Sequence, residues 1–245
     1  QILSRLALFL LFASITTFSF SQVVINEYSC SNMNGPLDSY GDNEDWVELY
    51  NSSGTPFDLT GYYLSDKSGN LLKWQIPSGS VPANGHMVVY CSGRNTVNAG
   101  ELHPNFNLKQ TQNEWIILTN PGGVVLDSFK IVHMTQMDHS VGRSTDGAAD
   151  FKLFTTPTPG ASNTGASDFY EPTPVMSLAP GFYTGAQTVS ITCANATATI
   201  HYTTDGTDPT AASAIYSGPI NVPNTMVVRA IAIGTNPPSF VETNT

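Results

Sequence analysis

The feature that most constrains this chain is a run of short alternating patterns broken by turn-forming residues, centred on residues 41–66. In the segment WVELY (46–50), Val47 and Leu49 alternate with bulkier or polar neighbours, the period of two expected for a half-buried strand. Turn-forming residues fill 51–56, and the apolar alternation resumes after them. The pattern predicts a buried hairpin around which the following chain folds.

Similar strand patterns separated by turn signals fill the rest of the sequence and predict an all-β protein. Charged residues make up 11% of the chain, well below the ~25% of a typical globular protein, as suits short strands joined by many turns. The net charge is −10 with nine basic residues, which argues against a nucleic-acid partner. The predicted strands cover residues 22–28, 71–76, 86–91, 114–119, 124–131, 187–193, 198–204 and 226–233.

The first 21 residues have the pattern of a signal peptide. Arg5 supplies positive charge, residues 6–15 are mostly apolar, and Ser19-Phe20-Ser21 matches a small-x-small cleavage site before Gln22. The apolar run falls short of the about 20 residues that span a membrane, although a retained anchor is the alternative. We therefore expect a secreted or cell-surface protein with no membrane span after cleavage.

The organisation beyond residue 21 follows from where the apolar periodicity stops. We predict a first domain over 22–163, a linker over 164–173 (TGASDFYEPT) and a second, smaller domain over 174–245. The sequence lacks an initiator Met and stops within a predicted last strand. We therefore expect the N-terminal part of a longer protein.

Three cysteines are an odd number for an exported chain. Cys30 and Cys91 lie in the same predicted domain, and a bridge between them could add roughly 4 kcal/mol in the chain-entropy model. The alternative is that each is a small buried apolar residue. Cys193 has no evident partner.

Specific motifs in both domains resemble known families. The segment GDNEDWVELYNSSGTPFDLTGYYLSD from Gly41 is similar to the central hairpin of the lamin-tail domain, and TIHYTTDGTDPT with YSGPI and VVRAIA resembles the C-terminal module of chitobiases and β-hexosaminidases. These resemblances imply two immunoglobulin-like β-sandwich domains in tandem. The end of the lamin-tail domain would correspond to Ser140, Gly142, Arg143, Asp146, Gly147, Thr158, Pro159, Gly160 and Asn163. Arg143 is expected either in a partly buried pair with a carboxylate or free in a solvated loop.

This order of domains resembles the N-terminal part of exported bacterial proteins that carry a CotH-type kinase domain further on. The resemblance implies a kinase-like region downstream, and no residue here matches a kinase motif.

One acidic cluster is a candidate calcium site because hard cations prefer several oxygen ligands. Asp42, Glu44 and Asp45 would be the ligands, although their spacing does not match an EF-hand loop. The alternative is a solvated acidic loop at the sheet edge. Calcium is the one cofactor that we consider.

Two aromatic side chains, Trp74 and Tyr63, are our candidates for exposed rings that stack on a sugar, the alternative being core residues. The tripeptide Asp138-His139-Ser140 has the residue types of a hydrolase triad. Adjacent residues of an extended chain point to opposite faces, so these three cannot form one. We predict no catalytic residues and no enzyme activity for these residues.

The function expected from these observations is a noncatalytic pair of extracellular or cell-surface modules for adhesion, positioning or protein–protein interaction. The alternative is a carbohydrate-binding accessory module of a secreted polysaccharide-active enzyme. The partner would be a protein or glycan at the cell surface.

Overall fold

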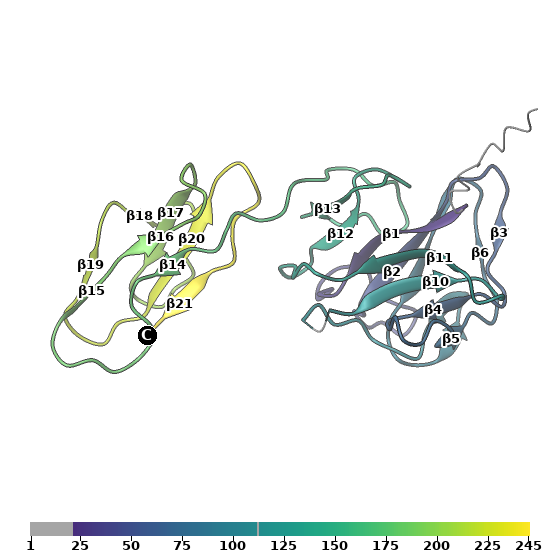
Figure 1. The fold of residues 1–245 in the computed structure, drawn as a ribbon, viewed down its shortest axis with the longest axis horizontal. Coiled ribbons are helices and arrows are strands. Elements are labelled where there is room, and N and C mark those ends of the chain that lie inside the picture. Colours follow the sequence, from purple (N-terminus) through teal and green to yellow (C-terminus); the bar gives the residue numbers. More distant parts are fainter. Residues whose placement is uncertain (1–21, 112) are drawn as a thin grey trace, which may run out of the picture.

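The computed structural model describes residues 22–111 and 113–245, so the predicted signal peptide lies outside the described residues. Within this range the chain forms strands and loops without a helix, in two units that lie end to end (Figure 1). The prediction of an all-β protein is confirmed. Among these residues no helix has the length and apolar character needed to cross a membrane.

The first unit is built on a large mixed sheet. Its strands are β1 (Val23–Ser29), β2 (Trp46–Asn51), β7 (Gly85–Tyr90), β8 (Thr96–Asn98), β9 (Glu101–His103), β12 (Ser140–Arg143) and β13 (Phe151–Phe154). They are ordered β13-β12-β1-β2-β7-β9-β8, antiparallel except for the pairing of β7 with β9. The hairpin β12–β13 falls in the stretch that resembles the end of a lamin-tail domain, where the sequence pattern predicted no strand. It extends the sheet beyond β1.

A second sheet packs against the first and completes a sandwich. Its strands are β4 (Tyr63–Ser65), β5 (Trp74–Gln75), β10 (Trp115–Thr119) and β11 (Val125–Lys130), in the order β11-β10-β4-β5. A short pair, β3 (Phe57–Asp58) with β6 (Ser80–Val81), closes one end. Fully buried apolar residues from both sheets, including Ile25, Leu49 and Leu118, form one continuous core.

Strand β2 differs from its predicted half-buried pattern because both of its faces are covered. Val47 and Leu49 point into the sandwich core, as expected. Trp46 and Glu48 on the opposite face are 1% and 0% exposed. That face lies under the segment 155–163, which we call the closing segment, and Gly160 donates its backbone N–H to Glu48 from there.

The second unit is smaller. Its strands are β14 (Val175–Met176), β15 (Gln187–Val189), β16 (Ile191–Thr192), β17 (Thr199–Thr203), β18 (Ala214–Ile215), β19 (Ile220–Val222), β20 (Val228–Ile233) and β21 (Glu242–Asn244). A four-stranded sheet, β18-β17-β20-β21, faces the short pairs β14-β16 and β15-β19. The core between them contains Met176, Val189, Ile191, Ile220, Val228 and Ala230.

The bridge between Cys30 and Cys91 does not form, and the register explains why. Ser29 pairs with Trp46, which in turn pairs with Tyr90, so β2 lies between the two cysteines. With strands about 4.8 Å apart, the two Cα atoms are about 10 Å apart, beyond the about 7 Å that a disulfide allows. Both thiols are free, and burial raises the pKa of each well above its usual value.

Candidate functional site

A network of buried polar side chains holds the closing segment against β1 and β2. Glu27 and Glu48 are cross-strand partners on these strands, and both are 0% exposed. Glu48 accepts hydrogen bonds from Asn26 Nδ2 at 2.9 Å and from the backbone N–H of Gly160 at 2.6 Å. Burial raises the pKa of Glu48 to about 8. The pKa of Glu27 is also raised by burial, even though the hydroxyls of Ser140 and Thr158 donate to it.

Arg143 and Asn163 extend this network to the second sheet and to the closing segment. Arg143 Nη2 lies 2.8 Å from Asp127 Oδ2 on β11, and its Nε donates to the carbonyl of Ile25 at 2.8 Å. The expectation of a partly buried ion pair is thus confirmed, and the solvated alternative is wrong. Asn163 Nδ2 donates to the carbonyl of Arg143 at 2.6 Å.

These contacts define what the network can do. The carboxyl oxygens of Glu27 and Glu48 accept hydrogen bonds from the chain itself, and neither side chain has surface open to solvent. A substrate therefore cannot reach them without displacement of the closing segment. Gly142 leaves no room either, because a Cβ there would lie 2.9 Å from the carbonyl oxygen of Asn26. The network stabilises the fold and fastens its last segment.

The acidic cluster predicted to bind calcium surrounds an arginine of the chain itself. Arg94 Nη1 lies 2.6 Å from Glu44 and 3.1 Å from Asp38, and its Nη2 lies 2.5 Å from Asp42. The guanidinium also lies over the ring of Tyr40. Asp42 and Glu44 therefore already neutralise a cation.

Asp45, the third predicted ligand, is set apart from this arginine. Its pKa is raised to about 7, mainly by burial. Within the described residues no group of three or more His, Cys, Asp or Glu side chains has the geometry to hold a metal ion. Calcium at Asp42, Glu44 and Asp45 stays a prediction that this arrangement does not support.

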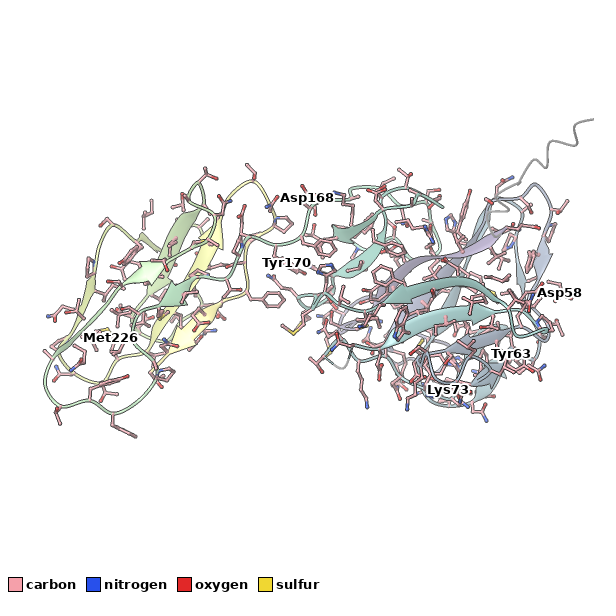
Figure 2. All side chains as sticks on the ribbon, viewed as in Figure 1. Asp58, Tyr63, Lys73, Asp168, Tyr170 and Met226 are labelled. Atoms are coloured by element: carbon pink, nitrogen blue, oxygen red, sulfur yellow. The ribbon has the colours of Figure 1, made fainter. Side chains whose placement is uncertain are left out.

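The two rings predicted to be exposed do not form a binding face. Trp74 is 4% exposed, belongs to the sandwich core and donates its indole N–H to Asn95 Oδ1 at 3.0 Å. The prediction of an exposed Trp74 is wrong because β5 is packed at the edge of the second sheet with its indole turned inward. Tyr63 on β4 is partly exposed, and Figure 2 shows it on the first unit, away from the second.

The tripeptide at residues 138–140 does not form a triad, although Asp138 lies in a turn with φ 60° and not on an extended strand as expected. Asp138 accepts backbone hydrogen bonds from Met33 and Asn34. His139 Nδ1 lies 2.7 Å from the hydroxyl of Tyr170, and Ser140 donates to Glu27. The three side chains have three separate sets of partners.

A groove in the second unit was not anticipated from the sequence. It encloses about 480 Å³, within the usual range for ligand pockets. Its floor includes Val189 and Val228 of the small core, and its rim carries the neighbouring aromatics Phe182 and Tyr183. A sequence signal for it is the pair Phe182-Tyr183 in a Gly- and Pro-rich stretch, which our sequence analysis did not single out.

The loop that forms this rim is held by several hydrogen bonds. Tyr183 donates its hydroxyl to the carbonyl of Ala179 at 2.8 Å, and Asn244 Nδ2 donates to the carbonyl of Leu178 at 2.8 Å. The N–H of Gly181 donates to the carbonyl of Thr245 at 2.8 Å. The side chain of Phe182, in contrast to that of Tyr183, is fully exposed.

The residues that connect the two units also form specific contacts, which we call the joint. The hydroxyl of Tyr170 accepts the backbone N–H of Gln136 at 2.8 Å, and its ring packs edge-on against Phe240 of the second unit at 5.1 Å. Gln136 Nε2 donates to the carbonyl of Pro238 at 3.0 Å. The predicted linker is therefore folded against both units, and Figure 2 shows Tyr170 between them.

Both ends of the joint are fastened. The backbone of Ser167 pairs with Leu153 of β13, and Phe169 stacks on His133 with ring centroids 3.8 Å apart. Glu171, which is buried, accepts the N–H of Asn236 at 3.0 Å in the second unit.

Comparison with known families assigns each unit. Residues 16–133 match the Lamin Tail Domain, and residues 178–242 match the Chitobiase/beta-hexosaminidase C-terminal domain. The first match stops before the hairpin β12–β13, which the structure places in the same sheet. No curated protein matches the chain. Both families are immunoglobulin-like modules, so residues 16–133 are similar to a lamin tail domain and residues 178–242 to a chitobiase/β-hexosaminidase C-terminal domain, in agreement with two β-sandwiches in tandem.

Proposed function

We propose that the chain is a noncatalytic pair of exported modules that holds its partners at a fixed separation at the cell surface. The joint is the observation that carries this proposal. Side chains from the first unit, the connecting segment and the second unit meet at Tyr170, so the two sandwiches are held together by more than a covalent tether. The signal-peptide pattern of residues 1–21 supports export.

The buried network supports a noncatalytic role for the first unit. Its acids Glu27 and Glu48 accept hydrogen bonds from Ser140, Thr158 and Gly160. Its arginine donates to Asp127 and to the carbonyl of Ile25. A general acid or base needs to be within hydrogen-bond reach of a substrate proton, and these groups are enclosed. A kinase-like region further along the polypeptide, as in CotH-type proteins, would fit a spacer role for these two modules.

A distance measurement between the units tests the proposal. Spin labels are attached at Ser68→Cys and Ala211→Cys, which are exposed positions in the first and second unit, in a Cys193→Ser background. A pulsed electron resonance experiment should give one narrow distance distribution. Tyr170→Ala should broaden it, because the contacts to Gln136, His139 and Phe240 are lost together. A broad distribution that Tyr170→Ala leaves unchanged would contradict the proposal.

Carbohydrate binding is the second candidate, and one observation favours it. The groove of the second unit presents an exposed aromatic rim above an apolar floor, the combination that pockets for small ligands use. Such binding would be compatible with a spacer that also contacts a polysaccharide.

A further inference from the structure

The groove of the second unit differs in charge from the rest of the chain. The chain carries a net charge of −10, yet none of the described residues that line the groove is Asp, Glu, Lys, Arg or His. A charged ligand placed here would lose hydration without gaining an opposite charge, which is costly. The lining therefore favours an uncharged ligand.

Free polar groups on the same rim indicate that the ligand is also polar. The side chains of Asn224 and Thr225 line the groove and have no hydrogen-bond partner among the described residues. Each can donate and accept a hydrogen bond. Buried against a purely apolar ligand, these groups would be left unsatisfied at a cost in free energy.

The aromatic residues complete the pattern. Tyr183 is held in place by its hydrogen bond to Ala179, and its ring packs on Gly181. Phe182 beside it is fully exposed, and Met226 lines the same groove (labelled on the second unit in Figure 2). Flat apolar surface next to amide and hydroxyl groups matches a pyranose ring, which has an apolar C–H face and a hydroxyl-bearing edge.

We propose that this groove binds a neutral glycan. Phe182 and Tyr183 stack on sugar rings, and Asn224 and Thr225 bind their hydroxyl groups. This inference rests on the second candidate function and gives it a site in place of Trp74 and Tyr63. The occupant is a chain of uncharged sugars, since the absence of charge in the lining complements neither an anionic glycan nor a basic peptide.

Titration of the intact chain with neutral oligosaccharides tests the site. The probes are hexasaccharides of β-linked glucose, xylose and N-acetylglucosamine, followed by isothermal calorimetry and by amide chemical shifts in NMR spectra. We expect at least one to bind with shifts at residues 181–187 and 222–226. Phe182→Ala should weaken that binding about tenfold or more, equivalent to about 1.4 kcal/mol. Because Phe182 is exposed, the variant should keep its fold, which the same NMR spectra verify.

Ile215→Ala is the matched control, because Ile215 is also a large exposed apolar residue of the second unit but does not line the groove. It should leave glycan affinity unchanged. Asn224→Ala should weaken binding without affecting an apolar probe such as a fluorescent naphthalene dye, which separates hydrogen bonding from general stickiness.

Four results would overturn the inference. They are no binding of any neutral glycan, tighter binding of anionic glycans such as alginate, binding only of apolar peptides, and glycan binding that Phe182→Ala leaves intact. The last would leave carbohydrate binding standing and reject only this site. None of them bears on the distance between the units, so failure here and failure of the spacer proposal are distinguishable.

Discussion

The two units are both β-sandwiches, but they differ in the side chains that they bury. The first places acids, amides and an arginine inside, with Glu27, Glu48, Arg143 and Asn163 buried around the closing segment. The second relies on apolar alternation, and along β20 every second residue is buried. A polar interior fixes one arrangement of a long closing loop, since any other leaves buried groups unpaired. The second unit has a small apolar interior, and it carries a groove on its surface where a ligand can bind.

The largest expected effect is on the polar interior of the first unit. Arg143→Ala should lower the unfolding free energy of the first unit by about 3–5 kcal/mol, because Asp127 loses its cationic partner and two backbone carbonyls lose a donor. All three tryptophans lie in the first unit, so denaturant unfolding followed by tryptophan fluorescence reports on it alone. Lys152→Ala, which breaks an exposed pair with Asp168, is the control and should leave the curve unchanged. Equal unfolding curves for the two variants would mean that the buried polar network does not stabilise the first unit.

The two units should also differ in how their stability depends on pH, because the buried acids with raised pKa lie in the first unit. Glu48 has a pKa of about 8 in the folded state against 4.5 normally, so its contribution is fully present below pH 4.5 and is lost as pH rises to about 8. Asp45, with a pKa of about 7, acts in the same direction. The unfolding free energy of the first unit should fall over this range by on the order of a few kcal/mol, and its melting temperature should fall with it.

Glu48→Gln sharpens this comparison, because it keeps the hydrogen-bonding shape and removes the titration. Its melting temperature, followed by tryptophan fluorescence between pH 5 and 8, should fall less than that of the unmodified protein. Parallel slopes for the two proteins would show that Glu48 does not titrate in this window.

A smaller effect is expected at the joint. Burial lowers the pKa of His133 and of His139, the latter against an opposing influence of Asp138. The neutral forms are therefore favoured in the joined state, and this stability is present above pH 6.5 and is lost as pH falls below it. The distance distribution between the units should broaden on acidification. Tyr170→Phe, which removes only the hydroxyl bonded to Gln136 and His139, should broaden it already at neutral pH.

The smallest effect concerns calcium. Because Arg94 already lies among Asp38, Asp42 and Glu44, added calcium should leave the melting temperature of the unmodified protein within about 1 °C. Arg94→Ala removes the internal cation and should make the melting temperature rise with calcium and return on chelation. A clear rise in the unmodified protein would restore Asp42, Glu44 and Asp45 as ligands.

Sequence patterns predicted long strands such as β1, β7, β10 and β20, but neither the hairpin β12–β13 nor the covered surfaces. The alternation at Val47 and Leu49 is local and was read correctly. The burial of Trp46 and Glu48 depends on the closing segment about 110 residues later, which no local period reveals. Trp74 was misjudged for the same reason, because its exposure is decided by Asn95 and the packing of the second sheet.

The candidate sites were likewise hard to predict where they depend on residues far apart in the sequence. The pairing of Arg143 was anticipated as one of two alternatives, and its position on β12 is what brings it to Asp127 of β11. The groove at Phe182 was missed because its wall joins residues 178–187 with 222–228 and 244–245. The contacts of Tyr170 were missed because a segment rich in Ser, Gly and Pro looks like a free linker until its partners are placed beside it.

The central claim is that the two units move as one body, and nitrogen-15 relaxation of the intact chain tests it most directly. Amides of β1 and β2 in the first unit and of β17 and β20 in the second should report the same rotational correlation time, and Tyr170→Ala should shorten it in the second unit. A shorter correlation time for β17 and β20 in the unmodified protein would contradict the account.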